Sequence, residues 1–114
     1  MTSTGRMVKI VLAVSLVWFV AGCNSMDRAD SVRTMNKGLE AYKLGRTMEG
    51  VRLLKEAAQK DPTYADPPYF LGQLYHMKLE ELDNAERYYR EAIERAPDNP
   101  QIAYRLGMVL ADQS

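Results

Sequence analysis

The sequence predicts an all-α fold in which pairs of antiparallel helices stack on one another. Small residues and prolines recur every 34 or 35 positions, and apolar residues within the repeats follow the 3.6-residue period of a helix. No segment from Ser31 onward alternates in the manner of a β-strand. Because stacked repeats bury their core only between neighbours, we expect one helical domain of about two and a half helix-turn-helix repeats.

Glycine, alanine and proline carry the repeat period. The recurring residues are Gly38, Gly72 and Gly107; Ala57 and Ala92; and Pro62 and Pro97. A glycine inside a helix costs about 1 kcal/mol relative to alanine. Its recurrence therefore predicts close approach of the paired helix, with Ala57 and Ala92 expected to meet the glycines.

The repeating unit resembles the tetratricopeptide repeat (TPR), whose pattern is W-x₂-L-G-x₂-Y, then A-x₃-F, then a closing proline. Repeat two matches best, through Leu71, Gly72, Tyr75, Ala85, Tyr89, Ala92 and Pro97. Repeat one keeps Gly38, Ala57 and Pro62, and the third begins with Leu106 and Gly107. The resemblance implies a right-handed superhelical stack whose first helices line a concave groove for a partner polypeptide.

The pattern sets the expected boundaries. Repeat one spans 31–64, repeat two spans 65–99, and 100–114 forms a partial third repeat or a capping helix; the helices are expected at 31–44, 47–60, 66–78, 82–95 and 100–112. Repeat two is one residue longer than usual, which we place in its inter-helix turn around 78–82. Because stable stacks usually need about three repeats, the last helix either caps repeat two or leaves a face for a partner or a second copy.

Polar residues near the expected helix starts predict the N-terminal caps. The expected caps are Asp30 or Ser31 for the first helix, Asp66 before Pro67 and Pro68, Asp83 with Glu86 as a capping box, and Asn99 before Pro100.

The N-terminus predicts a secretory signal. Arg6 and Lys9 give a positively charged start, and the run Ile10–Ala21 has Ser15 as its only polar residue. A helix of that length rises roughly 18 Å, which is short of the roughly 30 Å of bilayer hydrocarbon.

The apolar run ends at Val20-Ala21-Gly22-Cys23, which resembles the lipobox of bacterial lipoproteins. The resemblance implies removal of residues 1–22 by cleavage between Gly22 and Cys23, a covalent lipid such as palmitate on Cys23, and a polar tether through residue 30. Two or more acyl chains anchor firmly because each buried CH₂ contributes about 0.8 kcal/mol. Asn24 stands where an aspartate would retain such proteins in the inner membrane, which favours the outer membrane, facing the periplasm. The alternative is an ordinary signal peptide, or an uncleaved anchor, that happens to contain a cysteine.

Charge and composition exclude several function classes. Without Arg6 and Lys9, 13 basic and 15 acidic residues leave a net charge of −2, which argues against nucleic acid or a polybasic membrane patch as the target. His76 is the only histidine, Cys23 is the only cysteine and no phosphate-binding loop is present. We therefore expect no metal, no cofactor beyond the lipid, no small-molecule substrate and no enzymatic activity. The alternative is a small envelope hydrolase using His76.

A protein partner is expected on the first helices, where rigid aromatic and flexible thioether side chains favour recognition. The candidate groove residues are Tyr42, Tyr69, Gln73, His76, Met77, Tyr104 and Met108. The lysine–asparagine clamp by which some relatives hold a terminal carboxylate is replaced here by other residues, so an amphipathic helix or extended apolar segment is the expected ligand. Alternatives are packing of these residues against neighbouring helices, self-association through the last helix, and a pilotin-like role in assembling a pilus or secretion pore.

Overall fold

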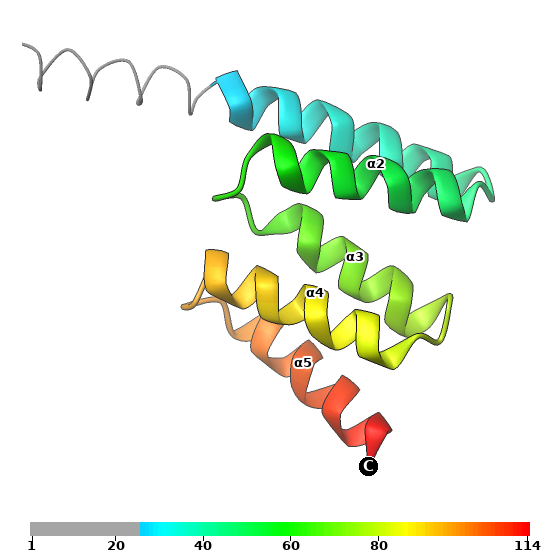
Figure 1. The fold of residues 1–114 in the computed structure, drawn as a ribbon, viewed down its shortest axis with the longest axis vertical. Coiled ribbons are helices and arrows are strands. Elements are labelled where there is room, and N and C mark those ends of the chain that lie inside the picture. The colour runs from blue at the N-terminus through cyan, green and yellow to red at the C-terminus, as the bar shows by residue number, and fades with distance from the viewer. Residues whose placement is uncertain (1–25) are drawn as a thin grey trace, which may run out of the picture.

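A computed structural model describes residues 26–114, and this part of the chain forms five helices without a strand (Figure 1). The N-terminal helix, described over residues 26–43, is followed by α2 (Thr47–Lys60), α3 (Asp66–Met77), α4 (Leu82–Arg95) and α5 (Pro100–Gln113). The predicted all-α, TPR-like fold is confirmed. None of these helices combines the length and the apolar composition that crossing a bilayer requires. The predicted signal peptide, Gly22 and Cys23 lie outside the described residues.

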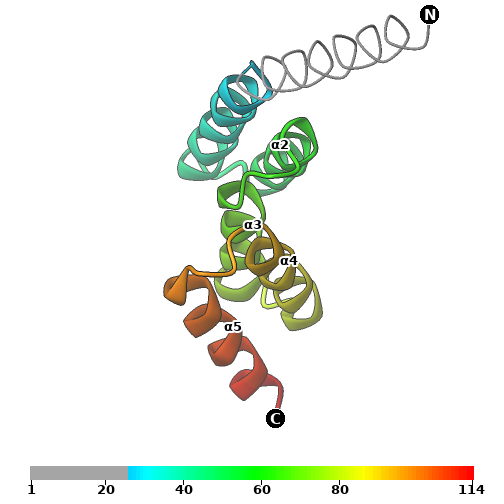
Figure 2. The same ribbon diagram turned by 90° about the vertical axis from the view of Figure 1, so that its left-hand side faces the viewer.

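The helices share one core that runs through the stack. Among the four labelled helices, α3 and α4 form the closest pair, while α2 packs against α3 and α5 packs against α4. Figure 2 shows the N-terminal helix, α3 and α5 towards one side of the stack and α2 and α4 towards the other. Core residues come from every helix and include Met35, Val51, Leu54, Leu71, Tyr75, Ala85, Tyr89, Ile102 and Val109.

Helix α4 illustrates how the sequence pattern produces this packing. Its buried residues are Ala85, Tyr88, Tyr89 and Ala92, which are three or four positions apart or adjacent and so lie on one face. The remaining face is rich in charged side chains, as a helix half-exposed to water requires.

The N-terminal helix begins earlier than predicted, because residues 26–30 are helical rather than part of an extended tether. Contacts with the loop after α2 explain the extra turn. The Arg28 guanidinium makes an ion pair with Asp61 at 2.6 Å and lies 4.2 Å from the centre of the Tyr64 ring. The prediction of a tether is therefore wrong for residues 26–30.

Of the predicted caps, only that of α5 is confirmed. The Asn99 side chain accepts a hydrogen bond from the backbone N–H of Gln101 at 3.0 Å, and Pro100 occupies the first turn. Asp66 lies inside α3, where it accepts a hydrogen bond from the Tyr64 hydroxyl, so the prediction for α3 is wrong.

The other two cap predictions are wrong because each helix begins before the residue that was predicted to cap it. α4 begins at Leu82, which places Asp83 within its first turn. Ser31 lies inside the N-terminal helix, fully buried, and its hydroxyl donates to the carbonyl oxygen of Ala57 at 2.7 Å. Asp30, also within this helix, pairs with Lys60 at 3.1 Å.

The turns that connect the two helices of each repeat differ in length by one residue, as predicted. Residues 44–46 connect the helices of repeat one, with Gly45 at φ 82°, and residues 78–81 connect those of repeat two, with Glu80 at φ 55°. The additional residue of repeat two therefore lies in its inter-helix turn.

Two of the recurring glycines, Gly38 and Gly72, do mark close approach, but their nearest neighbours differ from those expected, and a Cβ on Gly107 would meet nothing within 4 Å. A Cβ on Gly38 would lie 3.1 Å from the carbonyl oxygen of Gly50 and from Leu53 Cβ, and a Cβ on Gly72 would lie 2.6 Å from the Tyr89 ring. The nearest neighbours of these glycines are therefore Gly50, Leu53 and Tyr89 rather than Ala57 and Ala92. The paired helices are offset, so that bulkier side chains fill the space that the glycines leave.

Candidate partner-binding groove

The first helices of repeats two and three enclose a groove. Its volume is about 360 Å³, and we call it the α3–α5 groove. It is lined by Asp66, Tyr69, Phe70 and Gln73 from α3 and by Asn99, Gln101 and Ile102 from the start of α5. The Asn99 cap and Pro100 fix where α5 begins and hence which of its residues face α3.

Tyr69 and Gln73, two of the predicted groove residues, lie together in this groove. The Gln73 amide donates to the Tyr69 hydroxyl at 3.1 Å, and the Tyr69 ring packs against Phe70 and Tyr89 at centroid distances of 5.6 and 6.0 Å. The aromatic wall is therefore held from behind by the core. A rigid wall with an amide beside it suits a polypeptide, which offers both apolar side chains and backbone hydrogen-bonding groups.

His76 and Met77 link α3 to the far end of α5. The His76 Nε2 lies 2.7 Å from a carboxylate oxygen of Asp112, and the Arg105 guanidinium donates to Met77 Sδ at 3.9 Å. The His76 side chain is only 9% exposed. The His76 side chain therefore mainly connects α3 to α5, whereas the exposed Met77 side chain remains accessible.

The other predicted groove residues, Tyr42, Tyr104 and Met108, do not line this groove. Tyr104, 67% exposed, and Met108, 37% exposed, project from α5. Tyr42 is also partly exposed, but its Cβ lies 3.4 Å from the position that a Cβ on Gly50 of α2 would take. Tyr42 therefore sits beside α2 in repeat one and does not line the α3–α5 groove.

Sequence reasoning missed Phe70, Asn99 and Ile102 as lining residues. Phe70 and Ile102 belong to the apolar pattern that also builds the core, so periodicity could not separate the two roles. Asn99 could have been found, because it was already predicted to cap the helix that lines this side of the groove.

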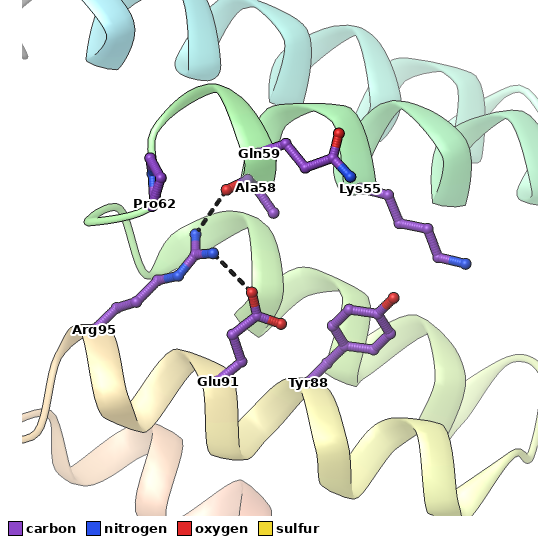
Figure 3. A pocket seen from close by; sticks show the side chains of 7 residues that line it. All are labelled: Lys55, Ala58, Gln59, Pro62, Tyr88, Glu91 and Arg95. Atoms are coloured by element: carbon purple, nitrogen blue, oxygen red, sulfur yellow. Dashed lines mark hydrogen bonds and ion pairs between the residues drawn. The ribbon is translucent and has the colours of Figure 1, made fainter.

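A second cavity, of about 430 Å³, lies between the second helices of the repeats. Figure 3 shows its lining: Lys55, Ala58 and Gln59 of α2, Pro62 of the following loop, and Tyr88, Glu91 and Arg95 of α4.

Arg95 explains the polar character of this cavity. Its guanidinium donates to the carbonyl oxygens of Ala58, Asp61 and Tyr64 at 2.9–3.2 Å and pairs with Glu91 at 2.7 Å. These carbonyls lie at and beyond the end of α2, where helical partners run out. With a side chain that is 11% exposed, Arg95 joins repeat one to repeat two rather than offering a free charge.

Aromatic and cationic side chains also contact one another at the junction between repeats one and two. The rings of Tyr75 and Tyr88 stack with 5.5 Å between centroids and 2° between planes. Lys55 Nζ lies 5.7 Å from the Tyr75 ring centre and the Arg87 guanidinium lies 4.9 Å from that of Tyr88. The contact with the Tyr75 side chain raises the pKa of Lys55 above its ordinary value.

The described residues offer little to a chemical reaction. Between Met26 and Ser114 no three His, Cys, Asp or Glu side chains are grouped as a metal ion would need. His76 is occupied by Asp112, and its buried Nδ1 has no hydrogen-bond partner in this part of the chain. Burial raises the pKa of Tyr89 to about 12, and its hydroxyl also lacks a partner among the described residues. Tyr89 is therefore a packing residue.

The comparison with known families supports a tetratricopeptide repeat in the C-terminal part of the chain. Residues 74–114, which cover the end of α3 together with α4 and α5, match the model of the tetratricopeptide repeat. No match to the chain was found among curated proteins. Tetratricopeptide repeats generally mediate interactions between proteins and are typically not catalytic.

Proposed function

We propose that this chain is a lipid-anchored interaction scaffold of the bacterial cell envelope, which holds a partner polypeptide in the α3–α5 groove. The observation that carries the proposal is the groove itself, with its Tyr69 wall and the Gln73 amide held in place by the core. Exposed side chains of Met77 and Met108 extend the apolar surface beside it. An amphipathic helix or an extended apolar segment fits this chemistry best.

The proposed anchor is the lipid on Cys23, which follows the apolar segment and the lipobox-like residues of the N-terminus. The domain would then lie close to the membrane, because its first described helix already includes residues 26–30, which follow Cys23 closely in the sequence. We propose the periplasmic face of the outer membrane as its location, on the basis of Asn24.

Site-specific photocross-linking tests the groove. A photoreactive amino acid in place of Gln73 or Gln101, both of which line the groove, is introduced into the full chain in living cells. We expect one discrete protein adduct from both positions and none from Gln59, an exposed glutamine of α2 on the other cavity. Equal adducts from all three positions, or none from the groove, would contradict the proposal.

The identity of that adduct also decides between a general scaffold and a pilotin-like assembly factor. A pore-forming secretin subunit as the single partner would favour the narrower role. The hydrolase alternative draws no support from His76, whose imidazole is nearly buried and paired with Asp112.

Incorporation of labelled palmitate tests the anchor. We expect the full chain to carry the label and to fractionate with the outer membrane, and the Cys23→Ser variant to carry none. Label retained in the Cys23→Ser variant would contradict lipidation at this cysteine.

A further inference from the structure

Charge is divided unevenly between the two ends of the stack. Residues 26–60, which form the N-terminal helix and α2, hold eight basic and five acidic residues, a net charge of +3. Residues 61–114 hold five basic and ten acidic residues, a net charge of −5. The overall value of −2, which argued against a membrane patch as a target, therefore conceals a basic end, which lies opposite α5 in Figures 1 and 2.

The basic end carries a hollow of about 600 Å³ between the N-terminal helix and α2. Its charged lining residues are all exposed, four basic and two acidic: Arg33, Lys37, Arg46, Arg52, Glu40 and Glu49. The three arginines form ion pairs of 3.5–4.0 Å with carboxylate side chains that are 44–50% exposed. Such exposed pairs contribute little to stability, so the arginines can exchange them for another anion. We call this surface the basic face.

Large apolar side chains lie at both ends of the basic face. Met26 and Leu44, at the two ends of the N-terminal helix, are 76% and 64% exposed. Both are seven residues from a basic residue of this helix, Arg33 or Lys37, and helical spacing therefore places all four on one side. The backbone N–H of Leu44 donates to the carbonyl oxygen of Glu40 at 3.1 Å, which keeps Leu44 in the helical register.

We propose that the basic face lies on a membrane surface that contains anionic phospholipids, with the N-terminal helix parallel to that surface. Arginine and lysine bind phosphate oxygens. The side chains of Met26 and Leu44 enter the boundary between headgroups and acyl chains, as the apolar residues of interfacial helices do. The membrane is favoured over an acidic protein because the helix follows Cys23 closely in the sequence. This choice of ligand rests on the proposed anchor.

The division of charge also sets the orientation of the domain. Salt screens exposed charges beyond about 8 Å at physiological ionic strength. An anionic surface therefore attracts the basic face that touches it, whatever the net charge of the whole chain. The opposite, acidic end is directed away from that surface, and with it the α3–α5 groove. The groove then stays open to a partner.

Lipid quenching tests the contact in the full chain. A fluorophore is attached to Asn36→Cys, which lines the basic face, or to Gln101→Cys, which lines the α3–α5 groove. The chains are reconstituted in vesicles of phosphatidylcholine, or of equal parts phosphatidylcholine and phosphatidylglycerol, with a nitroxide-headgroup lipid as quencher. We expect at least about threefold more quenching at residue 36 in the anionic vesicles than in the neutral ones, and no difference at residue 101. The labelled wild-type chain gives the background from Cys23. Equal changes at the two positions would overturn the proposal.

Matched charge reversals separate the basic face from net charge. One variant combines Arg33→Glu with Lys37→Glu, and the other combines Arg90→Glu with Lys78→Glu. Each removes an exposed lysine and an exposed arginine that has a carboxylate partner on its own helix. The first should reduce quenching at Asn36→Cys to the level in neutral vesicles, and the second should leave it unchanged. Equal effects of the two variants would contradict the proposal.

Salt provides a test without substitution. At about 1 M salt, where screening acts beyond roughly 3 Å, the difference between the two lipid compositions should disappear. A difference that persists would show that charge does not hold the face to the membrane. This result stands even if a charge-reversal variant fails to fold.

Palmitate labelling of the same samples separates this proposal from the anchor. A palmitoylated chain whose label at residue 36 is quenched no more than that at residue 101 overturns the contact alone. A chain without palmitate overturns the anchor, while quenching of its vesicle-bound fraction still decides the contact, and absence of bound chain overturns both. A discrete protein adduct from a photoreactive amino acid at Asn36 in cells, with no quenching by lipid, would assign the basic face to an acidic protein instead.

Discussion

Repeat two and helix α5 use the same sequence elements in opposite environments. In repeat two, Gly72 receives the ring of Tyr89, and the two helices close over a buried aromatic core. In α5, Gly107 occupies the same position of the pattern and meets open space. The comparison shows that the same residue of the repeat signature meets different surroundings in α3 and in α5.

The buried and exposed tyrosines provide the largest expected contrast. Tyr89→Ala should lower the free energy of unfolding by about 3–5 kcal/mol, because it removes a fully buried aromatic side chain and leaves a cavity against Gly72. Tyr104→Ala, on the open face, should change it by less than about 0.5 kcal/mol. Urea unfolding followed by circular dichroism measures both. Comparable losses in the two variants would mean that α5 is covered in the monomer.

The junction between repeats one and two gives the next effect. Arg95→Ala leaves three carbonyl oxygens near the end of α2 without their charged donor, and we expect a loss of about 1.5–3 kcal/mol. Arg90→Ala removes an exposed arginine of the same helix with a similar glutamate partner, and its effect should stay within about 0.5 kcal/mol. If both variants unfold at the same urea concentration, Arg95 does not join the repeats.

Alanine substitutions of the two glycines should act in opposite directions. Gly72→Ala forces a methyl group to within 2.6 Å of the Tyr89 ring, and we expect a loss of about 1–3 kcal/mol. Gly107→Ala meets no neighbour and should add about 1 kcal/mol through helix propensity alone. Gly45→Ala serves as a further control, because it meets no neighbour but has φ 82°, so it should destabilise through the backbone. Thermal unfolding of the three variants separates the effects of steric overlap, helix propensity and backbone strain on stability. If Gly72→Ala and Gly107→Ala changed the stability in the same direction, the contrast between the two glycines would be wrong.

Acidification should give the smallest effect. Burial opposes ionisation of Asp61, but hydrogen bonds from the Thr63 hydroxyl and the Arg28 guanidinium outweigh it and keep the pKa of Asp61 below its ordinary value. Because this pKa is lower in the folded chain than in the unfolded chain, the stabilisation is present above about pH 4 and is lost as the pH falls through the folded-state pKa. We expect Asp61→Asn to flatten the stability profile below about pH 4 relative to the wild-type chain. An unchanged acid limb would show that Asp61 does not contribute.

Most of the fold could be predicted from the sequence, because periodicity reports directly on which residues face a core. The four labelled helices begin and end within one residue of the expected positions. Helix caps were harder, since Asp66 and Asp83 each suit a cap by residue type, but Asp66 is the first residue of α3 and Asp83 is the second residue of α4. The partners of the glycines could not be predicted either, because the offset between paired helices depends on how Tyr89 packs in three dimensions.

The groove was only partly predictable from the sequence, because its lining depends on contacts between helices. Tyr69 and Gln73 were found because they share the exposed side of a first helix, and the structure brings them together with the start of α5. His76 has the same spacing, yet its pairing with Asp112 across two helices depends on how α5 crosses α3. Sequence spacing gives the face of one helix, and contacts between helices decide what remains accessible on it.

Native-state hydrogen exchange of the monomer at low protein concentration tests most directly whether α3 and α4 form a closed pair and α5 an open one. We expect the slowest exchange for amides in the middle of α3 and α4, which both pack on two sides, and faster exchange throughout α5, which is covered on one side only. Exchange in α5 as slow as that in α4 under these conditions would contradict the open environment of Gly107 and hence the contrast between α3 and α5.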